Sequence, residues 1–323
     1  MIRGLVIGKF YPPHRGHKFL IESALVQVDH LDVLICAHPG QTISGEQRRQ
    51  WLQEMHPAAL VRAIDDPGED DNSRFWAEYT IQILGRSPDI VFSSEDYGEP
   101  LARCLGCRHV MVDRGRVHVP ITASAVRSEP MRYWEFLEPC VRAYFAKRIS
   151  VVGAESTGTT TLARRLAEHY KTVWVPEYAR EYCASLQAAG VDLWTYQWRS
   201  EEFAEIARKQ QETEDRLARE ANRVLICDTD VLSTGIWHER YKGTGSAEVE
   251  AIVRGRPHDL YLLTDCDIPF VQDGLRDGET IRQWMTGRFE QVLEDRGLPW
   301  IKVSGGLEER LKRGILEVDK LLA

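Results

Sequence analysis

Two series of short apolar runs follow one another along the chain, and helix-like segments separate the runs within each series. The first series comprises residues 4–8, 31–38, 89–94 and 108–113. The second series comprises residues 148–153, 172–177, 223–230, 259–265 and 299–305. Strands that alternate with helices are joined by right-handed crossovers and form parallel sheets. The pattern therefore predicts an α/β chain with two parallel-sheet domains, and 323 residues suffice for two separate cores.

The two series meet at the segment YWEFLEPCVRAYFAK, residues 133–147, which we expect to form the closing helix of the first domain. The apolar run that starts at residue 148 then begins a new sheet. We therefore assign residues 1–146 to the first domain and residues 147–323 to the second.

The charge balance limits the classes of partner. Lys and Arg total 41 against 49 for Asp and Glu, so the chain is mildly acidic and is not expected to bind nucleic acid. No apolar stretch reaches the roughly 20 residues that span a bilayer, and no signal peptide precedes the first strand. The seven cysteines are scattered, as in a protein with reduced thiols. We expect a cytoplasmic protein without membrane insertion, and a homo-oligomer remains open.

The first run leads directly into the stretch GKFYPPHRGH, residues 8–17. Ligands of open parallel sheets bind beyond the carboxyl ends of the strands, where this stretch lies. The imidazoles of His14 and His17 can donate hydrogen bonds to phosphate oxygens there, and a helix N-terminus adds amide donors. Lone histidines are more often structural, so their neighbours decide the interpretation.

Those neighbours resemble the signature of the nucleotidylyltransferase superfamily. The matching residues are Gly8, Phe10, Pro12, His14, Gly16 and His17. The later stretch ITASAVR, residues 121–127, resembles the second motif of the superfamily through Thr122, Ser124 and Arg127. The resemblance implies a Rossmann-like fold and adenylyl transfer, in which a substrate phosphate attacks the α-phosphorus of ATP and pyrophosphate leaves. His14, His17, Lys9 and Arg127 would then stabilise the developing charge.

The stretches RFWAEY (74–79) and SSEDYGEPLA (93–102) are similar to segments of nicotinamide mononucleotide adenylyltransferases of the NadR type. The resemblance implies an aromatic side chain that stacks on the cationic pyridinium ring. Trp76 is the candidate for this contact, and a packing role in the core is the alternative for the same residue.

Residues 148–170 read as a strand, a glycine-rich loop and an amphipathic helix, which is the context of a P-loop. Gly153, Gly158 and the hydroxyl residue Thr160 fit the pattern, but Thr159 stands where the pattern has lysine. We expect the loop to bind the phosphates of ATP through Gly153, Glu155, Ser156, Thr157, Gly158, Thr159, Thr160 and Thr161.

Further parts of a kinase follow in order. Asp228 ends an apolar run, as a Walker B carboxylate does, and would hold Mg²⁺ together with Thr160. Glu177 and Arg180 follow the second run, where nucleoside kinases bind the acceptor sugar. Residues 271–285 resemble a lid that carries two arginines toward the phosphates. These arginines are Arg276 and Arg282.

Taken together, the two halves resemble the NadR family, in which an adenylyltransferase precedes a ribosylnicotinamide kinase. The resemblance implies a P-loop kinase fold for the second domain, ATP and Mg²⁺ as cofactors, and nicotinamide mononucleotide and nicotinamide riboside as substrates. Some members carry a DNA-binding module ahead of the transferase. Because the first strand begins at residue 4, we expect no such module and no repressor activity.

Three functions are consistent with these sequence features. The first is a two-step enzyme that makes NAD from nicotinamide riboside. The second keeps only the transferase, with a degenerate P-loop domain that senses nucleotide or docks on another protein, because Thr159 replaces the lysine. The third is an adenylyltransferase for another phosphate acceptor, such as phosphopantetheine, against which the kinase-like second domain argues.

Overall fold

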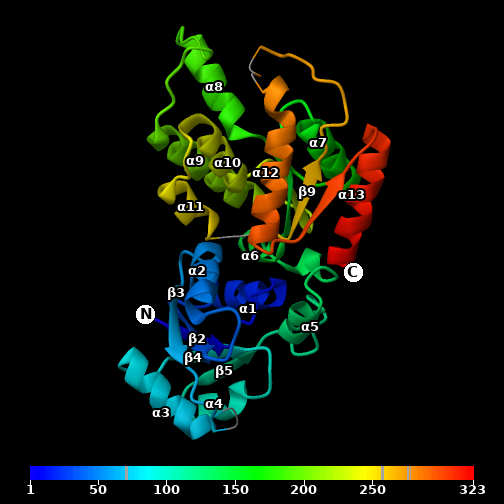
Figure 1. Cartoon of the computed structure of the whole chain (residues 1–323). Coiled ribbons are helices and arrows are strands. Elements are labelled where there is room, and N and C mark those ends of the chain that lie inside the picture. The colour runs from blue at the N-terminus through cyan, green and yellow to red at the C-terminus, as the bar shows by residue number, and fades with distance from the viewer. Residues whose placement is uncertain (70–71, 256–257, 275, 277) are drawn as a thin grey trace. The chain divides into compact units, whose positions relative to one another are not determined.

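The computed structural model describes residues 1–69, 72–255, 258–274, 276 and 278–323. It divides into two compact units, Met1–Val141 and Arg142–Ala323 (Figure 1). Each unit contains a five-stranded sheet in which all paired strands are parallel. The predicted α/β class with two parallel-sheet domains is confirmed, and the functional boundary at residue 147 stays a prediction.

The first unit has the strand order β3-β2-β1-β4-β5. Its strands are β1 (Arg3–Gly8), β2 (His30–Ala37), β3 (Leu60–Asp65), β4 (Ile90–Ser93) and β5 (Arg108–Met111). Its helices include α1 (Arg15–Leu25), α2 (Gly45–Met55), α3 (Ser73–Leu84), α4 (Gly98–Leu105) and α5 (Ala123–Ser128). Because chain order reverses between β1 and β4, a crevice opens beyond the carboxyl ends of these two strands.

Both faces of this sheet are covered, which explains why its central strands are apolar runs rather than alternating patterns. Leu20 and Ile21 of α1 and Leu52 of α2 pack on one face. Trp76 of α3 and Leu101 of α4 pack on the other face.

The second unit has the strand order β10-β9-β6-β8-β7. Its strands are β6 (Lys147–Gly153), β7 (Trp174–Val175), β8 (Val224–Asp228), β9 (Leu260–Thr264) and β10 (Trp300–Val303). Its helices include α7 (Thr159–Tyr170), α8 (Tyr178–Ala188), α9 (Ser200–Ala218), α10 (Val231–Lys242), α11 (Ala247–Val253), α12 (Arg282–Asp295) and α13 (Leu307–Leu322). Helices α7 and α13 cover one face of the sheet, and α10 and α12 cover the other (Figure 1).

The structure corrects the sequence prediction at three elements. Strand β3 was not predicted, because its burial alternates and polar residues interrupt its apolar pattern. The expected helix at 133–147 is a short 3-10 helix (Trp134–Phe136) followed by α6 (Pro139–Phe145). Pro139 lacks a backbone N–H and therefore starts a new helix instead of continuing one. Strand β7 has only two residues, and Pro176 follows it.

Within the described ranges, none of the helices has both the length and the apolar character that crossing a membrane requires.

Candidate active sites

A cavity of about 740 Å³ lies in the first unit, beyond the ends of β1 and β4. Seven residues predicted for the transferase site line it: Gly8, Lys9, Phe10, His17, Trp76, Ser124 and Arg127. His14, Gly16 and Thr122 do not line the cavity. His14 contacts His17 and Thr122 contacts Ser124, which do line it, and Gly16 contacts His14. The structure therefore brings the two sequence motifs together, although more than a hundred residues separate them.

The two histidines form a stacked pair at the start of α1. Their ring centroids are 3.8 Å apart, and Nδ1 of His14 caps the helix by accepting a hydrogen bond from the backbone N–H of Gly16 at 3.1 Å. Burial lowers the pKa of His14 to about 4 and holds the pKa of His17 well below its usual value. Both rings are neutral at pH 7, so they act here as hydrogen-bonding groups rather than as cations.

The positive charge of this cavity comes from Lys9 and Arg127. Nζ of Lys9 lies 3.7 Å from Oδ2 of the buried Asp66. Arg127 donates a hydrogen bond to the backbone carbonyl of Tyr11 at 2.8 Å, and its guanidinium lies 4.8 Å from the centre of the Tyr11 ring. These contacts hold Arg127 of the second motif against the backbone of the first.

The hydroxyl residues of the second motif set the start of α5. Oγ1 of Thr122 accepts a hydrogen bond from the backbone N–H of Ala125, and it lies 3.0 Å from Oγ of Ser124. The core packing that was the alternative for Trp76 is observed, and its stacking on a pyridinium ring stays a prediction. Trp76 packs in the core of the unit and also lines the cavity, and its Nε1 donates to the backbone carbonyl of Glu69 at 2.7 Å.

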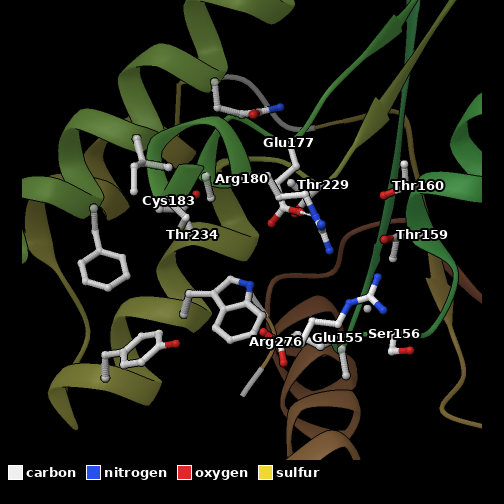
Figure 2. A pocket seen from close by; sticks show the side chains of 18 of the residues that line it. Glu155, Ser156, Thr159, Thr160, Glu177, Arg180, Cys183, Thr229, Thr234 and Arg276 are labelled. Carbon is white, nitrogen blue, oxygen red and sulfur yellow. Dashed lines mark hydrogen bonds and ion pairs between the residues drawn. The ribbon is translucent and has the colours of Figure 1, made fainter. Parts of the chain in front are cut away.

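A second cavity, of about 180 Å³, lies in the second unit where the P-loop meets helices α8, α9 and α10 (Figure 2). Ten residues predicted for the kinase site line it: Gly153, Glu155, Ser156, Gly158, Thr159, Thr160, Thr161, Glu177, Arg180 and Arg276. Thr157, Asp228 and Arg282 lie outside this lining and contact neighbours that belong to it.

Local packing explains the two glycines of the P-loop. A Cβ atom at Gly153 would lie 2.2 Å from Oγ1 of Thr264, so only glycine fits at the end of β6, where Gly153 is paired with Thr264 of β9. Gly158 has a φ of +86°, which side-chain-bearing residues rarely adopt. Thr157 faces inward, and its hydroxyl donates to the backbone carbonyl of Ala154 at 2.6 Å. The loop therefore wraps the N-terminus of α7, where amide groups can bind phosphate.

Asp228 sits at the end of β8 and contacts the first turn of α7. The hydroxyls of Thr159 and Thr160 lie near enough to its carboxylate to lower its pKa, so the residue in the lysine position faces the predicted Walker B carboxylate. Burial raises the pKa of Asp228 despite these hydroxyls. Its Oδ1 is buried and has no hydrogen-bond partner in the described part of the chain. A buried carboxylate oxygen without a partner, beside the hydroxyl of Thr160, fits Mg²⁺ as a ligand set.

An ion-pair chain connects the predicted sugar site to the lid segment. Nε of Arg180 lies 3.2 Å from Oε2 of Glu177, and its Nη1 lies 3.0 Å from Oδ2 of Asp273. Nε of Arg276 lies 3.2 Å from the same oxygen of Asp273. Burial, and after it the nearby Asp228, raises the pKa of Glu177 to about 7.

The lid segment is docked on the P-loop, with positions 275 and 277 outside the described residues. Oγ of Ser156 accepts from the backbone N–H of Val271 at 2.7 Å, and Oε2 of Glu155 accepts from the N–H of Gly278 at 2.6 Å. Arg282 donates to the backbone carbonyls of Ser156 and Ile268. Of the two predicted lid arginines, Arg276 lines the cavity, and Arg282 instead binds the backbone of the loop.

Sequence reasoning missed the wall of the cavity opposite the P-loop. The missed residues include Cys183, Trp198, Phe203, Gln210, Trp237 and Tyr241. The ring of Trp198 contacts Phe203 at 5.5 Å and Tyr241 at 5.7 Å between centroids, which gives this end of the cavity an aromatic lining. The available signal was the density of aromatic residues in the stretches WTYQW (194–198) and IWHERY (236–241).

A further missed residue is Arg310 of α13, which is only 3% exposed. It donates hydrogen bonds to the backbone carbonyls of Thr157, Gly305 and Asp265, and it pairs with Asp267. Arg310 therefore ties the P-loop to the loop after β10, and no motif in the sequence pointed to it.

The fold and the two cavities define an α/β chain whose second unit carries a P-loop. A family model described as AAA domain matches residues 148–310, and the chain belongs to this family. The predicted resemblance to the NadR proteins is also confirmed. The chain is 28% identical to the trifunctional NAD biosynthesis/regulator protein NadR of Escherichia coli (strain K12), over 93% of this chain and 78% of that protein.

Other known proteins match about half of the chain in sequence or nearly the whole chain in structure. A nicotinamide-nucleotide adenylyltransferase of Thermococcus onnurineus (strain NA1) is 27% identical over 54% of this chain and 98% of its own length. A solved structure of a NadR protein in complex with NR has a TM-score of 0.81 at 20% identity and covers 98% of this chain and 95% of its own. A structure of a NadR protein in complex with NAD and AMP-PNP has a TM-score of 0.80 at 20% identity, over 99% of this chain and 96% of its own.

Proposed function

We propose that this chain makes NAD in two steps. The second unit phosphorylates nicotinamide riboside with ATP, and the first unit transfers the adenylyl group of a second ATP to the resulting nicotinamide mononucleotide. The observation that carries the proposal is the presence of both cavities, in this order, in a chain similar to NadR over 93% of its length.

In the first unit, a phosphate oxygen of nicotinamide mononucleotide attacks the α-phosphorus of ATP, and the bond to pyrophosphate breaks. Lys9 and Arg127 supply positive charge at the cavity that both motifs line. His17 supplies a neutral donor at the N-terminus of α1, and His14 stacks on it and fixes its orientation. Trp76 offers an indole ring for contact with the cationic pyridinium. Such a site accelerates transfer by positioning and by charge stabilisation, without a covalent intermediate.

In the second unit, the amides of the P-loop hold the phosphates of ATP, and Glu177 and Arg180 lie where the ribose hydroxyls of the acceptor would bind. The aromatic residues at the far end of the same cavity suit a flat, positively charged ring. Thr160 and Asp228 would hold Mg²⁺, which when bound supplies positive charge to the phosphate oxygens. The expected cytoplasmic location stays a prediction.

The test is a product analysis with the full chain. Purified protein is incubated with ATP, Mg²⁺ and either nicotinamide riboside or nicotinamide mononucleotide, and the products are identified by mass. We expect NAD and pyrophosphate from the mononucleotide, and the mononucleotide together with NAD from the riboside. NAD from the mononucleotide alone would support the transferase with a nucleotide-sensing second unit. No NAD from either substrate would overturn the proposal.

A further inference from the structure

Gln41 is a partly exposed residue in the turn after β2, and it lines the cavity of the first unit. Its Oε1 accepts two hydrogen bonds, from the backbone N–H of His38 at 3.0 Å and from Nη2 of Arg48 at 2.6 Å. Because both of these groups can only donate, the oxygen of the amide is fixed toward them. In the part of the chain that the structure describes, Nε2 of Gln41 has no hydrogen-bond partner. The amide therefore keeps an N–H donor for a group that enters the cavity.

Arg48 of α2 lies behind this amide and is 0% exposed. Its guanidinium donates to neutral oxygens, which are Oε1 of Gln41 and the backbone carbonyls of Lys9, Cys36 and Ser44. A hydrogen bond from a charged donor polarises the amide that accepts it and strengthens the N–H of that amide as a donor. Through Gln41, a buried positive charge therefore acts on the surface of the cavity.

The contacts around Gln41 place it at the cationic end of the cavity. The same buried guanidinium that holds Oε1 of Gln41 also donates to the backbone carbonyl of Lys9. The next residue, Thr42, donates its backbone N–H to the hydroxyl of Tyr11 at 2.9 Å, and Arg127 donates to the carbonyl of the same tyrosine at 2.8 Å. Lys9 and Arg127 carry the positive charge of the described cavity lining. A ligand group that suits this end is anionic and accepts several hydrogen bonds, as a phosphate does.

We propose that Nε2 of Gln41 donates a hydrogen bond to a phosphate oxygen of a substrate in the first unit. This inference rests on the transferase half of the proposed function and adds a recognition residue that neither sequence motif contains. Nicotinamide mononucleotide and ATP both bring phosphate to this cavity, and they differ in which KM would depend on Gln41.

The experiment measures NAD formation by the full chain at varied nicotinamide mononucleotide and at varied ATP. Gln41→Met removes the donor and is expected to raise KM for one substrate about 10- to 100-fold and to leave KM for the other unchanged. A raised KM for the mononucleotide assigns the bond to its phosphate, and a raised KM for ATP assigns it to the triphosphate. Gln41→Glu keeps an oxygen acceptor for His38 and Arg48 and removes the donor, so it should raise the same KM. Gln50→Met, which changes an exposed amide of α2, is the control and should keep both constants.

The two Gln41 variants separate recognition from a structural role. If Gln41→Glu kept the native constants and Gln41→Met did not, the residue would act only by holding the turn through its oxygen, and the inference would be overturned. Equal changes in both constants, or native kinetics in both variants, would overturn it as well while the proposed function stood. A native chain that made no NAD from nicotinamide mononucleotide would overturn the transferase half of the proposed function together with this inference.

Discussion

His17 is held in place at the transferase cavity by two neighbouring rings. It stacks on His14 at 3.8 Å, contacts the edge of Phe10 at 4.9 Å, and its Nδ1 has no hydrogen-bond partner in the described ranges. His17→Ala removes one preorganised donor from the transferase cavity. Losing such a donor typically lowers the rate by about 10²–10³, and we expect that loss in NAD formation from nicotinamide mononucleotide. Near-native turnover in a folded variant would contradict the role of His17, and circular dichroism checks the fold.

His258 is a buried imidazole that the proposed reactions do not use. Its Nε2 lies 3.4 Å from Oε2 of Glu214, and its Nδ1 lies 3.3 Å from Oδ2 of Asp230. Burial disfavours the charged ring, but the two carboxylates outweigh burial and raise the pKa of His258. The other titratable or charged groups that face this cluster are Arg148, Asp215, Cys227 and Tyr261.

The raised pKa predicts how stability depends on pH. A group whose folded pKa exceeds its unfolded value stabilises the fold fully below the unfolded pKa, about 6.5 for His, and the contribution is lost as pH rises through the folded pKa. The melting temperature of the native chain should therefore exceed that of His258→Gln by more at about pH 6 than at about pH 8.5. The exposed His169→Gln is the control. A difference that grew with pH would contradict the assignment.

At the scale of elements, we expect the lid segment to compensate for the P-loop lysine that Thr159 replaces. At 4 Å and an effective dielectric of 20, one charge pair contributes about 4 kcal/mol before desolvation, so another cation should reach the phosphates. Arg276 is the lid arginine that lines the cavity, whereas Arg282 is bound to backbone carbonyls. We therefore expect Arg276→Ala to lower riboside phosphorylation by about 10²–10³.

Two further variants make the Arg276 test specific. Arg254→Ala removes an arginine that is 77% exposed and should leave the phosphorylation rate unchanged. In the Arg276→Ala background, Thr159→Lys restores the P-loop cation and should recover part of the activity. Full activity of Arg276→Ala alone would mean that the lid does not replace the lysine.

Strands could be predicted from the sequence where all of their residues are buried to a similar degree. Strands β1, β6 and β8 are buried on both faces and appear in the sequence as continuous apolar runs. The unpredicted β3 pairs with one neighbour, β2, at the edge of its sheet, and its polar positions hide the strand pattern. Pro139 is a local signal for a helix start, and it lies inside the segment that was predicted as one helix.

At the scale of the whole molecule, the sequence identified the parts of each site that local motifs specify. The P-loop and the histidine motif are contiguous, so their backbone geometry can be inferred from spacing. The aromatic wall combines Trp198, which precedes α9, with Trp237 and Tyr241 of α10. Such a combination depends on how helices pack, and no sequence spacing records it. Arg310 was missed for the same reason, because it reaches the P-loop from α13.

The two activities should be separable, because each cavity is formed within its own compact unit and its own sheet. Asp228→Asn keeps the shape of the side chain and removes the charge that Thr159 and Thr160 contact. We expect riboside phosphorylation to fall by at least about 10²–10³ and NAD formation from nicotinamide mononucleotide to keep its native rate. His17→Ala should give the reverse pattern, so each variant is the control for the other. Both rates are measured on the same preparation of each variant. Loss of both activities in a folded Asp228→Asn chain would show that the two units are coupled in catalysis.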